Sequence, residues 1–154
     1  MRYWLMKSEP DEFSIDDLIA APKQTTAWFG VRNYQARNFM RDQMRVGDKV
    51  FFYHSSCPEP GIAGIATVNS TAYPDMTQFE RNSPYFDPKS PRDAPRWLNV
   101  DVTLVKKTPL VSLARLRLHP ELAGMRLLAR GNRLSIMPVD PREWDFITTR
   151  LMKL

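Results

Sequence analysis

The sequence contains little cysteine, histidine or glycine and no long hydrophobic run. Its 154 residues include one cysteine, Cys57, two histidines and six glycines. A single cysteine excludes an internal disulfide and favours a reducing, intracellular setting. The apolar stretch near the N-terminus is too short to predict a signal peptide, and no run approaches the length of a membrane span. We therefore expect a cytoplasmic protein without a membrane partner.

The patterns that mark catalytic and cofactor sites are also scarce. A metal site needs several Cys, His or carboxylate ligands, and no phosphate-cradling G-x-x-x-x-G-K-[ST] or dinucleotide-binding G-x-G-x-x-G is present. His54 and Cys57 lie three residues apart, which leaves a Cys–His nucleophile open. That pair falls at the end of a predicted strand and in a Pro-containing turn, without a third group to orient it. We predict no catalytic residue, no metal and no cofactor.

Positive charge is abundant and uneven. The net charge is +5, which favours an anionic partner. Residues 9–17 carry only acidic charges, whereas residues 106–133 carry many cations and Glu121 alone against them. Arginine, whose planar fork suits bidentate phosphate contacts, outnumbers lysine. Spacing of four would place Arg37, Arg41 and Arg45 on one helix face. The predicted phosphate-binding residues are Arg32, Arg37, Arg41, Arg45, Arg126, Arg130 and Arg133.

The pattern of apolar and turn residues predicts a mixed α and β chain. Two helices have clear N-terminal signals: Ser14 with Asp17, and Asp140 with Glu143, both form capping boxes. Further helices are expected at 33–46, 110–118 and 120–128. An opening strand ended by a turn is expected within residues 1–10. Further strands are expected at 49–54, 62–68, 97–107 and 134–139, the third of these with strict apolar–polar alternation.

Two irregular features stand out between these elements. Gly64 inside a predicted strand indicates a bulge or a close backbone approach. Residues 73–95 form a Pro-rich loop that contains aromatic residues, and loops of this length are commonly functional. With no linker or repeat in the chain, we predict one domain, residues 1–154. Its expected fold is α+β, a bent, barrel-like mixed sheet of five or six strands with peripheral helices.

Several separated motifs resemble those of the EVE domain family, in the same order along nearly the whole chain. They are Tyr3–Pro10 followed by Phe13–Ile15, Trp28–Met40, Gly47–Asp48 with Phe52–Ser55, Gly61–Gly64, and Arg133–Val139. The resemblance implies a PUA-like pseudobarrel related to YTH domains, which hold a methylated RNA base in an aromatic cage. It implies a protein that reads modified bases in DNA or RNA, and no catalytic activity.

The resemblance also suggests where the base would lie. Trp28 corresponds to the first cage wall, following Lys7 and Ser8 as a tryptophan follows a Lys-Ser pair in YTH domains. The second wall would come from the 73–95 loop or just after it, with Tyr85, Phe86 and Trp97 as candidates. The full predicted base pocket is Lys7, Ser8, Trp28, Asn33, Tyr34, Tyr53, His54, Ser55, Tyr85, Phe86 and Trp97.

Structural roles remain open for several of these residues. Trp28 would equally suit a hydrophobic core, Ser8 a turn, Asn33 a helix cap, and His54 a strand-end hydrogen bond. Two alternative functions also remain open: an accessory enzyme of RNA processing or modification, and a protein-interaction module. A methylated adenine and a modified pyrimidine are equally compatible with the sequence, as are DNA and RNA. The oligomeric state is undetermined, and we expect a monomer.

Overall fold

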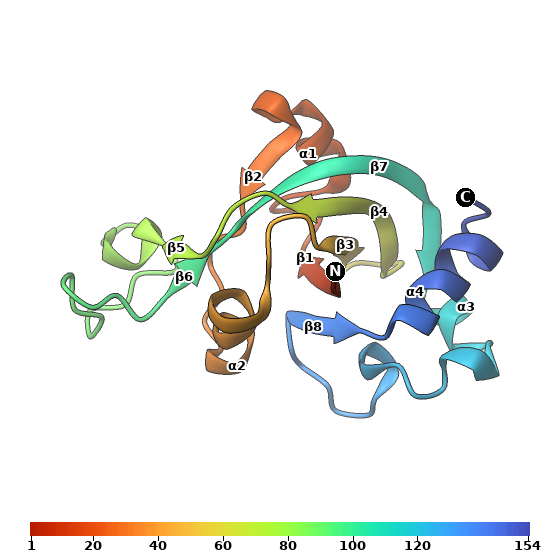
Figure 1. The fold of residues 1–154 in the computed structure, drawn as a ribbon. Helices are drawn as coiled ribbons and strands as arrows, with labels where there is room; N and C mark the ends of the chain where they lie inside the picture. The colour runs from red at the N-terminus through yellow and green to blue at the C-terminus, as the bar shows by residue number, and fades with distance from the viewer.

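Eight strands and four short α-helices follow one another along the chain in the computed structural model, which describes residues 1–154 (Figure 1). The strands are β1 Tyr3–Ser8, β2 Thr25–Ala27, β3 Lys49–His54, β4 Gly61–Val68, β5 Tyr73–Pro74, β6 Leu98–Asn99, β7 Asp101–Ser112 and β8 Ile136–Val139. The α-helices are α1 Ile15–Ala20, α2 Tyr34–Asn38, α3 Leu113–Arg117 and α4 Pro141–Phe146.

Six of the strands form one curled sheet in the order β2-β7-β4-β3-β1-β8. β1 and β3 run parallel, and the other neighbours run antiparallel. The long strand β7 arches over the sheet, while β5 and β6 form a small separate ribbon (Figure 1). This arrangement confirms the predicted α+β, PUA-like fold with a bent mixed sheet.

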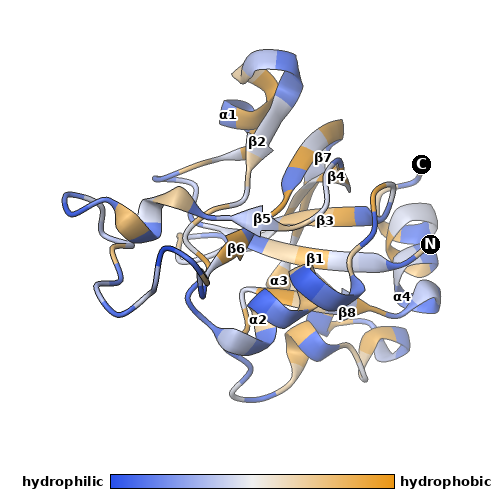
Figure 2. Ribbon diagram, turned by 60° about the vertical axis from the view of Figure 1, so that its left-hand side comes forward, coloured by the Kyte–Doolittle hydropathy of each residue, from blue (hydrophilic) through white to orange (hydrophobic).

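Alternate residues of the central strands enter two different cores. In β1 and β3, Trp4 and Phe52 belong to one buried cluster, whereas Leu5 and Phe51 belong to the other. Because side chains alternate along a strand, the two clusters lie on opposite faces of the sheet. The first, with α1 and α2, also contains Trp28. Figure 2 shows the hydrophobic residues concentrated along the central strands.

Side-chain hydrogen bonds fix the starts of three helices, α1, α2 and α4, and the two predicted capping boxes are confirmed. Ser14 and Asp17 form the capping box of α1, and Asp140 and Glu143 form that of α4. In each, the cap side chain accepts from a backbone N–H of the first turn, and the carboxylate three residues later accepts from the backbone N–H of the cap residue. Asn33 caps α2 by accepting from Ala36 N–H at 3.0 Å.

The helix that begins at Tyr34 ends differently from the prediction. It passes into a π-helical turn, Phe39–Gln43, where Met44 N–H donates to the carbonyl of Phe39. The wider turn changes the angular spacing of residues, and Arg45 lies beyond the helix. The prediction that Arg37, Arg41 and Arg45 share one helix face is therefore wrong.

The segment after β7 also differs from the prediction. Residues 110–112 continue β7, so the helix expected at 110–118 is shortened to α3. The helix expected at 120–128 is replaced by two short 3₁₀ turns, Pro120–Leu122 and Arg126–Leu128. Buried Leu122 and Leu127 anchor these turns to the second core, so packing decides their form.

Gly64 meets both expectations for a glycine inside a strand. The register between β3 and β4 shifts beside it, between Phe52 and Tyr53. A Cβ at Gly64 would lie 2.6 Å from Ile15 Cδ1 and 2.9 Å from the carbonyl oxygen of Lys106. Glycine thus allows α1 to pack directly against the sheet.

The β5–β6 ribbon and the chain between its strands form an arm, residues 73–99, which projects from the sheet (Figure 1). Buried Gln78 holds it together: its amide donates to the carbonyls of Asp75 and Trp97, and its oxygen accepts from Ser90 and Trp97. The predicted long loop is therefore ordered. No helix in the structure is both long and apolar enough to cross a membrane.

Candidate base-binding site

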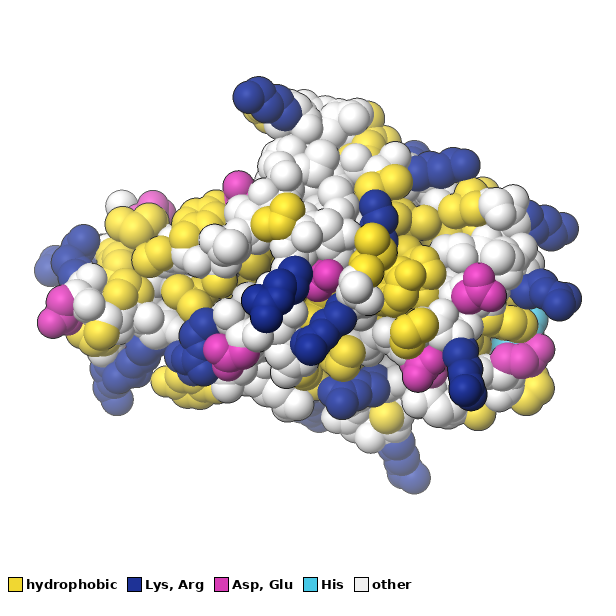
Figure 3. Space-filling model, viewed as in Figure 1, with side chains coloured by type: hydrophobic (Ala, Val, Ile, Leu, Met, Phe, Trp, Pro, Cys, Tyr) yellow, Lys and Arg dark blue, Asp and Glu magenta, His cyan; other side chains and the backbone are white.

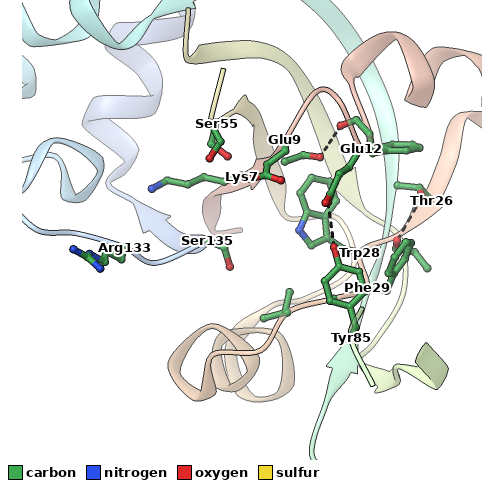
Figure 4. Close-up of a pocket in the computed structure, with 16 residues that line it drawn as sticks. Lys7, Glu9, Glu12, Thr26, Trp28, Phe29, Ser55, Tyr85, Arg133 and Ser135 are labelled. Atoms are coloured by element: carbon green, nitrogen blue, oxygen red, sulfur yellow. Dashed lines mark hydrogen bonds between the residues drawn. The ribbon is translucent and has the colours of Figure 1, made fainter. Parts of the chain in front are cut away.

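A cavity of about 630 Å³ opens beside Trp28, between the end of β1, the loop from β2 to α2, and the arm. Figure 4 shows its lining residues. Six residues of the predicted binding set line it, five from the base pocket and one from the phosphate-binding group: Lys7, Ser8, Trp28, Ser55, Tyr85 and Arg133. The structure therefore brings together residues from widely separated parts of the sequence.

Trp28 is both a core residue and a cavity wall. Its side chain is 7% exposed and packs edge-on against Phe52, with ring centroids 5.3 Å apart. Its backbone N–H donates to the carbonyl of Val100 at 2.8 Å, which fixes the loop after β2. Trp4 and Trp97 donate their indole N–H groups to carboxylates, whereas that of Trp28 has no partner in the protein and points to the side of Lys7 and Ser135 (Figure 4).

The opposite side of the cavity carries a cation. Lys7 lies at the end of β1, and no carboxylate pairs with its ammonium group. Partial burial lowers the pKa of Lys7 below its ordinary value. Backbone bonds from Lys7 to Ser135 at 2.8 Å and from Ser55 to Ser8 at 3.0 Å hold this corner rigid. The cavity thus offers two free donors, Lys7 Nζ and Trp28 Nε1.

Tyr85 reaches across from the arm to the loop after β1. Its hydroxyl donates to Glu12 Oε2 at 3.1 Å (Figure 4). Its ring lies on Gly30, where a Cβ would approach Tyr85 Cζ to 2.8 Å and φ is +83°, so only glycine suits this position. Burial and then the hydrogen bond to Glu12 raise the pKa of Tyr85. Tyr85 is therefore a fixed aromatic wall of the cavity.

An ion pair between Arg32 and Asp75 ties the arm to the loop that carries Trp28. The Asp75 carboxylate is fully buried and accepts from Arg32 Nη1 at 3.0 Å and from Gly30 N–H at 2.8 Å. Arg32 also donates to the carbonyl of Tyr85 at 2.8 Å. Burial alone would raise the pKa of Asp75, but the hydrogen bonds from Thr77, Gly30 and Arg32 outweigh it and lower that pKa. Arg32, predicted to bind phosphate, is thus occupied inside the protein.

Three predicted pocket residues lie outside the cavity because β3 and α2 use them structurally. Tyr53 is 3% exposed and belongs to the core on the opposite face of the sheet from Trp28. Asn33 caps α2. His54 Nε2 accepts from the N–H of Ile15 at 3.1 Å, and its pKa is lowered, chiefly by burial.

The hydrogen bond to His54 also bears on the Cys–His alternative. When Nε2 of a neutral imidazole accepts a bond, Nδ1 carries the proton. Neither nitrogen of His54 is then free to deprotonate Cys57. The described contacts of His54 are those of a strand-end structural residue.

Of the other three predicted pocket residues, Phe86 and Trp97 belong to the arm and Tyr34 begins α2. The rings of Tyr34 and Trp97 stack with centroids 4.9 Å apart, and the guanidinium of Arg32 lies over the Trp97 ring, 5.5 Å from its centroid. Trp97 Nε1 donates to Asp87 at 2.8 Å. Phe86, next to Tyr85, does not line the cavity either. Trp97 of the arm and Tyr34 of α2 therefore form a second aromatic cluster, in which the Trp97 ring and N–H already have partners within the protein.

The predicted phosphate-binding arginines differ in their contacts. Arg133 lines the cavity, and Arg45, Arg126 and Arg130 are exposed. Arg37 donates to Asn38 and to the carbonyl of Arg96, and Arg41 pairs with Asp42 at 2.8 Å. Lys and Arg side chains alternate with acidic groups over the face in Figure 3 and form no continuous patch there.

Ten lining residues were absent from the predicted set: Glu9, Glu12, Phe13, Thr26, Ala27, Phe29, Gly30, Val31, Ser56 and Ser135. Two carboxylates, Glu9 and Glu12, give the cavity hydrogen-bond acceptors beside its cation. Glu9 directly follows the Lys7-Ser8 pair and Phe29 follows Trp28. Their position next to predicted pocket residues was the sequence signal that could have placed them at the cavity. Ser135 reaches the cavity only through the pairing of β1 with the chain before β8.

Comparisons with known proteins agree with this fold along the whole chain. The EVE domain model matches residues 2–150. Human thymocyte nuclear protein 1 is 48% identical over 163 aligned residues, covering 94% of this chain and 72% of the human protein. A solved structure from Pseudomonas putida has a TM-score of 0.91 at 50% identity and covers 99% of each chain.

A further solved structure contains a ligand. It is the human THYN1 protein in complex with DNA containing 5-methylcytosine, with a TM-score of 0.92 and 47% identity over 97% of this chain and 96% of that one. The extent of these matches decides the family. This chain belongs to the EVE domain family.

Proposed function

We propose that this protein binds DNA containing a modified base, with 5-methylcytosine as the first candidate, and holds that base in the cavity beside Trp28. The observation that carries the proposal is an open cavity of about 630 Å³ whose lining combines the aromatic residues Trp28 and Tyr85 with an unpaired cation, Lys7. The human relative solved with 5-methylcytosine-containing DNA supports the choice of ligand. The role is binding, without conversion of the base.

Stacking and methyl burial would supply much of the affinity. An aromatic ring stacked on a base contributes roughly 1–3 kcal/mol, and Trp28 and Tyr85 both line the cavity. Full burial of one methyl group adds roughly 0.8 kcal/mol. A methylated base would therefore bind several-fold more tightly than its unmodified form, even without a polar contact to the modification.

The polar groups of the cavity complement the edge of cytosine. That edge presents one amino donor and two acceptors. Lys7 Nζ and the indole N–H of Trp28 are donors without partners in the protein, and the Glu9 carboxylate is an acceptor at the same cavity. We infer that Lys7 serves an acceptor on the edge of the base and that Glu9 serves its amino group. The Trp28 N–H lies in the plane of its ring, so a base stacked on that ring is not its partner.

Phosphate contacts would come from cations whose charge is not used inside the protein. Arg133 at the cavity, with exposed Arg45, Arg126 and Arg130, meets this requirement. Each phosphate contact contributes to affinity independently of sequence and is weakened by salt. Base selectivity would then depend on the cavity, and overall affinity on these arginines.

The direct test compares labelled oligonucleotides that differ at one base. DNA and RNA strands with 5-methylcytosine, cytosine or N6-methyladenine are titrated with protein and followed by fluorescence anisotropy. We expect tighter binding of the 5-methylcytosine DNA, and loss of that preference in Trp28→Leu. Equal affinity for all strands would contradict the proposal.

Because Trp28 also packs in the core, its variants need a control for folding. Trp28→Leu should lower stability by an amount typical of a core truncation, up to about 3–5 kcal/mol, while melting cooperatively. Trp28→Phe keeps an aromatic face and should keep part of the preference. Trp97→Phe, the matched change in the arm, should leave base preference intact.

A further inference from the structure

Phe29 lies at the rim of the cavity and has no place in the core. Its side chain is 51% exposed, whereas its neighbour Trp28 is 7% exposed. The two residues are consecutive in the loop after β2, and their side chains have opposite environments, one in the core and one toward solvent. Figure 4 shows Phe29 beside Tyr85, on the side away from Lys7 and Arg133.

The backbone on both sides of Phe29 is fixed. Trp28 N–H donates to Val100, and Gly30 N–H donates to the buried Asp75 carboxylate, each at 2.8 Å. The Phe29 ring meets the ring of Tyr85 edge-on, with centroids 5.9 Å apart. Tyr85 is itself held by Glu12 and by its seat on Gly30. An exposed aromatic ring is therefore presented in a rigid position.

When a cavity takes up one base of a duplex, the neighbouring bases lose a stacking partner. A base inside a DNA duplex reaches such a cavity only by leaving the stack, which leaves a gap between its neighbours. Proteins commonly insert an apolar side chain at an unstacked step, and this contact favours the opened form. An exposed, rigid aromatic at the cavity rim has the chemistry for that contact.

We propose that Phe29 inserts into duplex DNA at the position vacated by the bound base, so that this protein takes a modified base from double-stranded DNA. The inference rests on the function proposed above. It adds the double-stranded form of the ligand and a residue that acts only on that form. In single-stranded DNA the base is already accessible, so Phe29 has no gap to fill.

The test compares Phe29→Ala on two forms of one ligand, a duplex with a single 5-methylcytosine and the same strand alone. We expect Phe29→Ala to weaken duplex binding about tenfold, on the scale of one lost stacking contact, and to change single-strand binding less than twofold. Phe29→Leu should restore part of the duplex affinity. Leu118→Ala removes another exposed apolar side chain, which is 77% exposed and directly follows α3, and should change neither affinity.

A mismatched duplex sharpens the result. Placing the 5-methylcytosine opposite adenine lowers the cost of unpairing for both proteins alike, so both should bind more tightly and the deficit of Phe29→Ala should remain. Equal losses on duplex and single strand, or no loss on the duplex, would overturn the inference while leaving the cavity proposal standing. Failure of the wild-type protein to prefer 5-methylcytosine in either form would instead remove the proposed function. Unchanged thermal melting of Phe29→Ala confirms that the fold is intact.

Discussion

Two tryptophans lie in similar surroundings, each beside an aromatic ring and close to a cation: Trp28 in the cavity and Trp97 in the arm. Around Trp97, Tyr34 stacks on the ring, Arg32 lies 5.5 Å from its centroid, and Asp87 accepts its N–H. Around Trp28, the indole N–H has no protein partner and open space remains.

The two tryptophans differ in how many of the neighbouring polar and charged groups have partners within the protein. Around Trp97, the Arg32 charge is neutralised by Asp75 and the indole N–H is bonded to Asp87. In the cavity, Lys7 is unpaired and burial makes its charge costly to keep. The same residue types therefore build a scaffold in one place and a candidate binding site in the other, and unsatisfied groups distinguish the two.

The largest expected effect comes from breaking the arm. Asp75→Ala removes the acceptor for Arg32, Gly30 and Thr77. We expect a loss of about 3 kcal/mol, the lower end of the range for breaking a buried pair, because Arg32 keeps 21% exposure. Urea denaturation of the wild type and the variant measures this loss of unfolding free energy. Asp87→Ala, which removes a more exposed acceptor of the same arm, should cost only about 1 kcal/mol.

Acid should affect wild-type protein and Asp75→Ala differently. The pKa of Asp75 is lowered by folding, so its stabilisation is present above the unfolded pKa and is lost as pH falls through the folded value. Wild-type stability should therefore drop toward that of the variant in acid. A constant difference across this pH range would contradict the role assigned to the carboxylate.

The second effect concerns the unpaired cation of the cavity. Lys7→Met keeps the length and removes the charge, and should weaken 5-methylcytosine DNA by roughly 1.5–3 kcal/mol, the range for a hydrogen bond to a charged group. Arg37→Met, the corresponding change on α2, removes a cation that lies 4.8 Å from the Tyr34 ring and should not alter base preference. Isothermal titration calorimetry at neutral pH compares the affinities of the two variants. Equal losses of affinity would contradict a specific contact between Lys7 and the base.

Alkaline pH provides an independent check on Lys7. Because folding lowers its pKa, the folded protein loses this proton first as pH rises, and stability increases between the folded and unfolded pKa values. Base affinity should fall over the same interval as the cation disappears. Lys7→Met should show neither change. A wild-type affinity that stays flat through this interval would exclude a charged contact.

How far the sequence predicts this structure depends on how local each signal is. The capping boxes at Ser14 and Asp140 are confirmed because their hydrogen bonds span three residues. Gly64 is confirmed because a missing side chain marks a close approach. The contacts of Asp75 with Gly30 and Arg32 join residues more than forty positions apart, and no pattern within either segment encodes them.

The candidate site follows the same division. The family resemblance placed Lys7, Ser8 and Trp28 together, and the structure brings them to one cavity. The choice among Tyr85, Phe86 and Trp97 depended on the path of the arm, which packs Tyr85 on Gly30 and turns Trp97 toward Tyr34. Sequence composition also could not distinguish arginines with internal partners from exposed ones.

The smallest effect separates those two kinds of arginine. Arg133→Gln should reduce the slope of log affinity against log salt by about 0.7–0.9, the contribution of one phosphate contact. Arg37→Gln should leave the slope unchanged, because Arg37 donates to Asn38 and to Arg96. Anisotropy titrations across a salt series give both slopes. A reversed result would assign phosphate binding to the α2 side, as the arginine spacing alone predicted.

The most direct measurement of the central difference follows the indole N–H signals by NMR during titration with 5-methylcytosine DNA. The four tryptophan signals are assigned with single Trp→Phe variants. We predict a large shift of the Trp28 signal, because a base stacked on its ring changes the surroundings of an N–H that has no protein partner, and little change at Trp97, whose N–H is held by Asp87. A shift at Trp97 with Trp28 unmoved would contradict this account and place the base on the arm.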